Sequence, residues 1–410
     1  MNAVDGEDAE HEVVQRQNGR FRWSHGTALI LLAALIALAP HVDGFKWFVA
    51  VYALATLLWS GGACPTGFLR RGKPRRSTVI LIAIALRLTV AFSPPTLSGD
   101  VFRYLSDGRM LASGVNPYAY TPTDPRINHP EIRSIYPPHA QLLFVLAHQL
   151  WSWRALIIAF DVLALLLLRD RAFAYATCPL VIFEGTWNGH LDAIAAVFLL
   201  LALTRRSGAA LAFAGGLKVI PLAASPVLAR GARWKNVLAF IATLTIPVLP
   251  FLGKPLMPGF REYATRWIFN APAYDIVRAI VERIPTKEIW THHPLRFQWL
   301  SDFVYRHVYP DFITRAILAT IAIGGILLAR RVSSAVAILL VCSPAIHPWY
   351  WLTLVPSALV ERSRWLYVAL CAPASYLLYD HVHPLIVYAL CYALPASIAL
   401  TRLRLSKTAS

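Results

Sequence analysis

Acidic and basic residues lie close together in one short stretch of this sequence, residues 98–109. At about 100° per residue, a helix here places polar side chains on one face, Asp100, Arg103, Tyr104 and Asp107, and apolar ones on the other, Val101, Phe102 and Leu105. Because an apolar block precedes the stretch, we expect a short interfacial helix whose charged face turns away from lipid. Asp100 then stands where a membrane-embedded substrate meets water. Two simpler roles stay open: Asp100 as a helix N-cap, and Arg103 with Asp107 as an ordinary ion pair.

Other polar groups interrupt apolar segments, where an unpaired charge is costly. His190 and Asp192 begin an apolar block, so they must face the protein interior or a water-filled cavity, unless they only cap a helix. Lys218 follows two glycines and precedes Pro221, which predicts a broken helix able to bind an anion; a lysine that reaches to the membrane surface is the alternative. His347 stands beside three amphipathic rings and could bind phosphate or carry a proton, although the rings alone indicate an interfacial belt.

Two charges and five cysteines receive no catalytic role. Arg87 and Asp161 lie within apolar blocks, where a structural ion pair and phosphate binding are equally good interpretations. The cysteines are scattered and lack the paired spacing of a metal site or a disulfide framework.

The composition indicates which class of protein must position these groups. Of 410 residues, 57% are hydrophobic and 15% are charged, whereas about a quarter of an ordinary soluble domain is charged. The apolar residues form blocks of about 15 to 20 residues, the length that crosses a hydrocarbon core. We therefore predict an all-α polytopic membrane protein with about 11 to 14 transmembrane helices and short interfacial helices in two outer loops.

Basic clusters predict the orientation of these helices. The net charge of +17 comes from short clusters between apolar blocks, which the positive-inside rule places in the cytoplasm, so the charge does not indicate nucleic-acid binding. Loops 96–137 and 253–311 then lie outside, with the turns around His347 and His381. Arg169 and Arg171 conflict with this arrangement: either 138–152 is a half-helix or one basic cluster breaks the rule.

The predicted organisation is simple. Residues 1–25 form a polar cytoplasmic tail that lacks the apolar core of a signal peptide, and 403–410 form a second cytoplasmic tail. Residues 26–402 form a single transmembrane domain. The expected location is the plasma or inner membrane.

Several motifs in order carry a family resemblance. They are Gly99-Asp100-Val101-Phe102-Arg103-Tyr104, Asp107-Gly108-Arg109, Gly114-Val115-Asn116-Pro117-Tyr118, Tyr136-Pro137-Pro138, Asn188-Gly189-His190-Leu191-Asp192, Gly216-Leu217-Lys218 and His347-Pro348-Trp349-Tyr350. This series resembles the polyprenyl-phosphate-mannose-dependent mannosyltransferases of the GT-C superfamily, over most of the chain. The resemblance implies a GT-C-like bundle, with Asp100 as catalytic base and a lipid-phosphate sugar donor held between the spans.

One base without an obvious carboxylate nucleophile favours a single displacement with inversion. We expect the enzyme to act in cell-envelope biosynthesis. Asp100 deprotonates an acceptor hydroxyl of a lipid or glycan, and Lys218, His347 and Arg103 stabilise the departing phosphate. Supporting or substrate-binding residues are Tyr104, Asp107, Arg109, Tyr136, Asn188, His190, Asp192, Trp349 and Tyr350. No cofactor and no metal are expected. The site should lie under the helix that starts at Asp100, with loop 253–311 as its roof and membrane lipids around it.

A transporter or flippase for a lipid-linked or small polar solute is the main alternative, because many spans with internal charges suit transport too. Transporters tend to place polar groups near the midplane in symmetric positions. Here most polar groups gather toward one face beside two long loops, which favours an enzyme. An intramembrane protease or lipid hydrolase is less favoured, since no Gly-x-Ser-x-Gly motif occurs.

Overall fold

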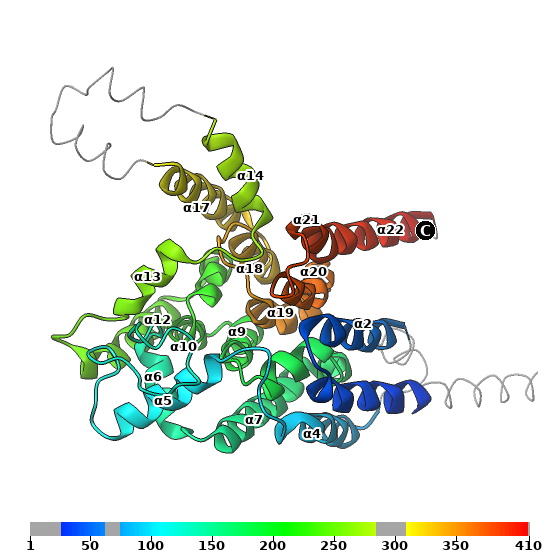
Figure 1. The fold of residues 1–410 in the computed structure, drawn as a ribbon, viewed down its shortest axis with the longest axis horizontal. Helices are drawn as coiled ribbons and strands as arrows, with labels where there is room; N and C mark the ends of the chain where they lie inside the picture. Colours follow the sequence, from blue (N-terminus) through cyan, green and yellow to red (C-terminus); the bar gives the residue numbers. More distant parts are fainter. Residues whose placement is uncertain (1–25, 62–73, 284–308, 409–410) are drawn as a thin grey trace, which may run out of the picture.

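The computed structural model of the protein describes residues 26–61, 74–283 and 309–408 (Figure 1). The predicted N-terminal tail and the basic cluster at 70–73 lie outside these ranges, as does part of the second long loop. Within the described ranges the chain is helical, with one isolated β-bridge and no strand. The predicted all-α fold is thereby confirmed.

The helices follow one another with short connections. Up to residue 251 they are η1 (Ala39–His41), α2 (Phe45–Gly61), α4 (Arg76–Ala91), α5 (Asp100–Ala112), α6 (Pro138–Leu146), α7 (Leu150–Leu168), η2 (Arg169–Arg171), α8 (Ala172–Ala176), η3 (Val181–Trp187), α9 (Asp192–Arg205), α10 (Gly208–Leu217), η4 (Ile220–Ala224), α11 (Ser225–Ala229), α12 (Trp234–Thr245) and η5 (Ile246–Phe251). The rest are α13 (Pro258–Arg266), α14 (Pro272–Val281), α17 (Pro310–Leu328), α18 (Val332–Val341), η6 (Pro348–Leu354), α19 (Val355–Glu361), α20 (Trp365–Cys371), η7 (Ala372–Leu378), α21 (Pro384–Tyr388), η8 (Ala389–Ala393) and α22 (Leu394–Thr408). Helix α22 thus includes 403–408 of the predicted tail.

Several helices have the length and composition of membrane spans. In the described ranges these are Leu150–Ala176, Trp234–Phe251, Pro310–Leu328 and Pro384–Thr401, and the pair η3 and α9, bent by 117°, is a fifth if it forms one broken span. Only 6% of the apolar window in Trp234–Phe251 is buried, so its side chains face outward, as helices in lipid do. Six shorter apolar helices of 10–17 residues accompany them. The protein is a polytopic membrane protein, and the total of 11 to 14 spans stays a prediction.

Helix α6 bears on the conflict over Arg169 and Arg171. It contains nine residues and ends at Leu146. At 1.5 Å per residue it is about 14 Å long, roughly half of the hydrocarbon thickness. The structure therefore favours the half-helix interpretation of this segment.

Helix α9 occupies the centre of the described bundle and packs against α7, α10, η6 and α19 (Figure 1). Nearly all of its residues from Asp192 to Ala202 are buried. Four alanines in this stretch let neighbouring helices approach closely, as small residues do at helix contacts in membranes. Asp192, the first residue of this buried helix, therefore needs a charged or hydrogen-bonding partner inside the protein.

Arg87 and Asp161 form a structural ion pair between α4 and α7. Arg87 Nε lies 2.6 Å from Asp161 Oδ2, and both side chains are buried. The Tyr175 hydroxyl donates to the other carboxylate oxygen at 2.6 Å, and Arg87 Nη1 donates to two backbone carbonyls. Of the two interpretations left open by the sequence, the structural one is correct.

The apolar face of α5 does not meet lipid, contrary to the sequence-based expectation. Val101 and Leu105 are 0% and 4% exposed and pack inside the protein. Helix α6 lies close against α5 because Gly108 has no side chain: a Cβ there would stand 2.3 Å from the Phe144 carbonyl oxygen. The helix is therefore covered on both sides, and its first turn faces a cavity.

Candidate active site

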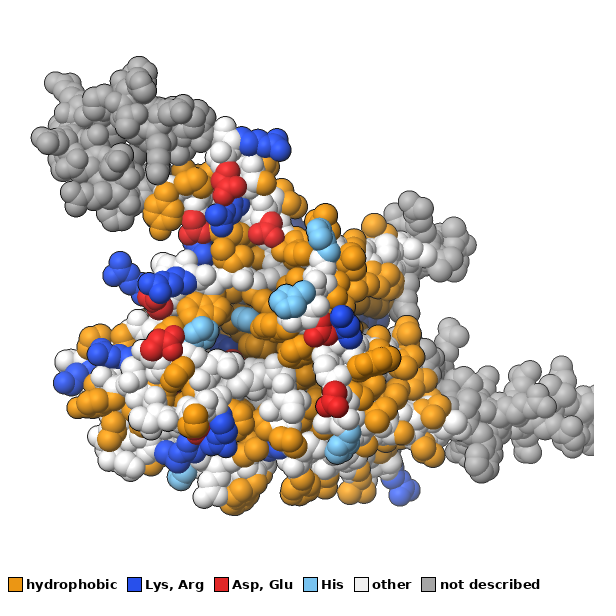
Figure 2. All heavy atoms as spheres, in the orientation of Figure 1, with side chains coloured by type: hydrophobic (Ala, Val, Ile, Leu, Met, Phe, Trp, Pro, Cys, Tyr) orange, Lys and Arg blue, Asp and Glu red, His pale blue; other side chains and the backbone are white. Residues whose placement is uncertain are grey.

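A cavity of about 770 Å³ opens on the face that carries α5 and α13, which is hollowed near its centre in Figure 2. Its walls come mainly from residues 95–136, residues 263–269, the turn at 347–350 and Lys218 after α10, and Phe45 and Tyr379 complete them. Predicted site residues that line it are Asp100, Arg103, Tyr136, Lys218, His347, Trp349 and Tyr350. Residues about 250 positions apart in the sequence thus share one cavity.

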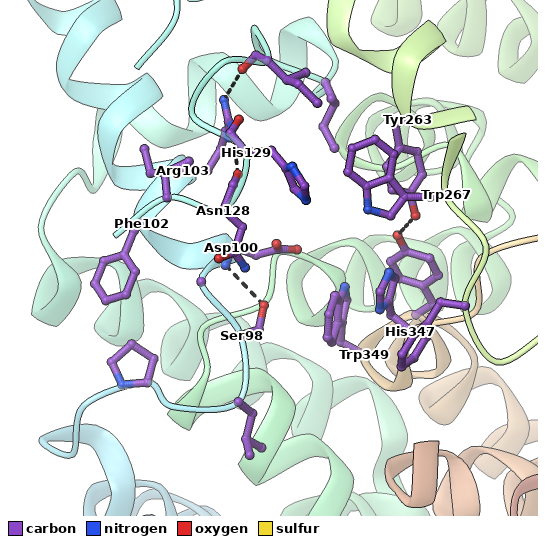
Figure 3. Close-up of a pocket in the computed structure, with 18 of the residues that line it drawn as sticks. Ser98, Asp100, Phe102, Arg103, Asn128, His129, Tyr263, Trp267, His347 and Trp349 are labelled. Atoms are coloured by element: carbon purple, nitrogen blue, oxygen red, sulfur yellow. Dashed lines mark hydrogen bonds between the residues drawn. The ribbon is translucent and has the colours of Figure 1, made fainter. Parts of the chain in front are cut away.

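Among the described residues that line this cavity Asp100 is the only acid, and its carboxylate points into the cavity (Figure 3). It is the first residue of α5, whose N-cap is Gly99, so the proposed capping role is not formed. Its backbone N–H donates a hydrogen bond to Ser98 Oγ at 3.2 Å. Burial raises the pKa of the Asp100 carboxyl, although the charges of Lys218 and Arg103 and a hydrogen bond with Tyr136 act in the opposite direction. A raised pKa makes this carboxylate a stronger base than a solvated one.

Lys218 contributes a cation to the wall of the cavity. It ends α10 in an extended conformation, as the predicted helix break requires. Its Nζ lies 3.0 Å from Asp192 Oδ2 and 4.6 Å from the centre of the Tyr350 ring. Asp192 is fully buried, whereas 12% of the Lys218 side chain is exposed. The buried carboxylate thus pairs with the ammonium group, and Lys218 still lines the cavity.

His347 lies within a column of stacked rings. His190, Trp349, His347, Phe269 and Tyr379 follow one another with centroid separations of 4.2, 4.4, 4.6 and 5.2 Å. The backbone of Phe269 joins the turn before His347 through hydrogen bonds with the flanking residues of Ala345, 3.0 and 2.8 Å long. Because both faces of the His347 ring are covered, only its nitrogen-bearing edge can meet a ligand.

Two residues of this column that line the cavity have a buried polar atom without a hydrogen-bond partner. Within the described part of the chain, His347 Nδ1 and Trp349 Nε1 are buried and make no hydrogen bond. Both residues line the cavity. A buried donor without a partner is unfavourable, so a bound molecule with hydroxyl or phosphate oxygens would suit this wall.

Arg103 holds the first loop in place. Its Nη1 donates to the Ile132 carbonyl at 2.7 Å, and its Nη2 donates to the carbonyls of His129 and Asn128 at 2.7 and 3.2 Å. The i,i+4 pair with Asp107 is not formed. Arg103 lines the cavity, but most of its donors already stabilise the loop that forms one wall.

The remaining predicted residues surround the cavity. Tyr104 lies behind Asp100, in an edge-to-face contact with Tyr136 at 5.0 Å. Asp107 accepts hydrogen bonds from Ser134 and Gln141, and burial raises its pKa to about 6.

Three predicted residues that do not line the cavity have partners elsewhere in the structure. Arg109 pairs with Asp124 at 3.2 Å on the outer surface. Asn188 accepts a hydrogen bond from the Leu97 N–H and donates one to the Phe183 carbonyl. His190 faces Glu184, with Nε2 3.4 Å from its Oε2.

The sequence predicted that loop 253–311 would cover the site, but it did not indicate which residues of the loop take part. Tyr263 on α13 shares a hydrogen bond with the Tyr350 hydroxyl, and the Trp267 ring meets the His129 ring at 4.8 Å (Figure 3). These contacts close the cavity between the first loop and the second. The aromatic residues on one face of α13 were the available signal, but their partners are distant in the sequence.

Gly189 joins the first loop to the start of α9. Its φ of +73° favours glycine, and a Cβ there would lie 2.9 Å from Val101 Cγ2. Gly189→Ala is expected to destabilise the protein by about 2–5 kcal/mol, the sum of backbone strain and overpacking. Gly114→Ala is the matched control, because Gly114 has a φ of +78° with open space around it. Denaturant unfolding in detergent measures both, and equal losses would contradict the close contact.

No three His, Cys, Asp or Glu side chains gather as a metal site in the ranges that the structure describes.

The structure is therefore a multi-span helical protein with one cavity that a carboxylate and a lysine both line. Residues 10–137 match the MptA_B family, described as the N-terminal domain of an alpha-(1->6)-mannopyranosyltransferase. The matched region includes the entire first loop and Asp100. This match to part of the chain confirms the predicted resemblance to a mannosyltransferase family. No curated protein and no solved structure matched the chain.

Proposed function

We propose that the protein transfers mannose from a polyprenyl-phosphate donor to an acceptor hydroxyl, with Asp100 as base. The observation that carries the proposal is that Asp100, Lys218 and His347 line one cavity. Acid–base catalysis needs a carboxylate beside the acceptor, and a departing phosphate needs a fixed cation. Apolar side chains of the same walls suit the first isoprene units of a lipid carrier.

The reaction is a single displacement. The acceptor oxygen forms a bond to the anomeric carbon, its proton passes to Asp100, and the bond from that carbon to the phosphate oxygen breaks. The departing polyprenyl phosphate keeps the electron pair, and Lys218 with His347 stabilises its charge. With one carboxylate at the site, the configuration inverts, so a β-linked donor yields an α-linked product. The matched family is described as alpha-(1->6), and we adopt this linkage and a lipid or glycan acceptor.

The cavity is proposed to face the extracytoplasmic side of the plasma or inner membrane, as part of cell-envelope biosynthesis. Arginines gather at the opposite ends of the helices, where Arg169 follows α7 and Arg205 ends α9. The positive-inside rule assigns such ends to the cytoplasm. A donor that is anchored in lipid is consistent with a site at this depth.

The proposal is tested with purified protein in detergent and an α-mannoside acceptor. We expect transfer of radiolabelled mannose from a polyprenyl-phosphate donor and none from GDP-mannose, because the nucleotide lacks the lipid that the apolar walls hold. Transfer from GDP-mannose at the same rate would overturn the donor assignment. Uptake of the lipid-linked sugar into proteoliposomes without any transfer would favour the transporter alternative.

A further inference from the structure

A second cavity, of about 740 Å³, lies among basic helix ends. Five arginines and a single acid line it, which leaves a formal excess of four positive charges. The lining residues with charges are Arg76, Arg169, Arg171, Arg205, Arg362 and Asp170. The rest of the wall is leucine, valine and threonine.

This basic cavity is separated from the sugar-transfer cavity by the length of the helices between them. Helix α9 begins at Asp192, which holds Lys218, and ends at Arg205, which lines the basic cavity. Its 14 residues span about 21 Å. Helix α4 likewise begins at Arg76, and its other end leads to Asp100. The two cavities therefore lie on opposite sides of the bundle.

Three of the five arginines stand at positions that are costly for the backbone or for the helix dipole. Arg76 is the first residue of α4, where a positive charge is unfavourable. Arg169 and Arg362 have φ values of 49° and 50°, which favour glycine or asparagine at helix ends. All five arginines nevertheless line the same cavity.

An apolar slot of about 270 Å³ adjoins the basic cavity. The two share Arg76, Leu166, Arg169 and Asp170. The slot is otherwise lined mainly by apolar side chains of α4, α7 and α8, which are Val79, Ile80, Leu165, Ala172 and Phe173. A basic cavity that continues into an apolar slot suits a molecule with an anionic headgroup and a hydrocarbon chain.

We propose that this basic cavity binds the phosphate headgroup of a membrane lipid, with a hydrocarbon chain in the apolar slot. Arginine binds phosphate with two parallel hydrogen bonds, and several arginines suit a group with more than one negative charge. The lipid is held at the face opposite the sugar-transfer cavity. The proposal does not depend on the proposed function, since its test measures binding and not transfer.

The test is binding of fluorescent phosphatidic acid to the protein in detergent micelles. Arg76→Gln is expected to weaken binding about tenfold or more, and it should not harm the fold, because it removes a cation from a helix N-terminus. Arg233→Gln is the matched control. Arg233 is also an exposed arginine at a helix N-terminus, and it lies outside the cavity. It belongs to the same side of the bundle, where Asn236 of α12 donates to the Arg206 carbonyl at 2.9 Å.

Two further measurements distinguish the remaining outcomes. Arg362→Gly removes a cavity arginine while relieving its backbone strain, so it should keep the fold and still weaken binding. Glycerol phosphate, which has the headgroup without chains, should compete about 100-fold more weakly than the lipid. Equal weakening by Arg76→Gln and Arg233→Gln would show surface attraction only and overturn the proposal. Equal competition by glycerol phosphate would overturn its lipid part.

Discussion

Asp100→Asn is expected to lower kcat for mannose transfer by about 10²- to 10⁴-fold, the usual contribution of a general base. The amide keeps the size of the side chain but cannot take the acceptor proton. Donor binding should change little, because the phosphate meets Lys218 and His347 instead. Radiolabelled transfer assays at saturating donor measure the effect.

Asp107→Asn is the matched control, on the same helix two turns further on. Its carboxylate accepts from Ser134 and Gln141 through one oxygen, at 2.5 and 3.0 Å, and an asparagine carbonyl can accept both bonds. Transfer should therefore fall by less than about tenfold. If Asp107→Asn lost transfer and Asp100→Asn kept it, the assignment of the base would be wrong. Unfolding in detergent should show both variants to be folded.

The pH dependence of the wild-type protein checks the same assignment. A base works in its deprotonated form, so kcat/KM should rise with pH as Asp100 loses its proton. Because burial raises the pKa of Asp100, the midpoint of this rise should lie above the ordinary aspartate value of about 3.9. A midpoint at or below that value would contradict the buried environment of the base.

Lys218→Met is the second substitution with a large expected effect, on stability and on transfer together. It leaves the Asp192 carboxylate buried without the cation that lies 3.0 Å away. Breaking one side of a buried ion pair costs about 3–5 kcal/mol. Transfer should also fall by about 10²-fold or more, because the leaving phosphate loses its fixed charge.

The double variant Asp192→Asn/Lys218→Met separates the two effects. Removing both charges should restore much of the free energy of unfolding, since no unpaired charge is left inside the protein. Transfer should stay as low as in Lys218→Met. Recovery of transfer in the double variant would show that Lys218 serves only the fold. Denaturant unfolding and transfer assays on the four proteins of this cycle measure both quantities.

Much of the architecture could be predicted from local sequence properties. The apolar blocks indicated a membrane protein, the spacing of Asp100, Arg103 and Asp107 indicated a helix, and the glycines before Lys218 indicated a helix break. Each of these follows from residues that are neighbours in the chain. The motif series also led to the same class of enzyme as the family match over residues 10–137.

The roles of individual charged residues could not be predicted in this way. Arg103 was expected to bind phosphate, but it is largely occupied with loop carbonyls at 128–132. Val101 and Leu105 were expected to face lipid, but α6 and the Gly189 turn cover that side of α5. Periodicity identifies a face of a helix and cannot say what lies against it.

The sequence by itself determined that lipid is the main solvent of this chain, that a charged helix begins at Asp100, and which residue types could move a sugar. Only the tertiary structure decided that Asp192 pairs with Lys218, that five rings stack around His347, and that five arginines meet at one cavity. The physical reason is that composition and periodicity act over a few neighbouring residues. Charge pairing and ring stacking depend on how distant helices pack, and on which groups the packing removes from water.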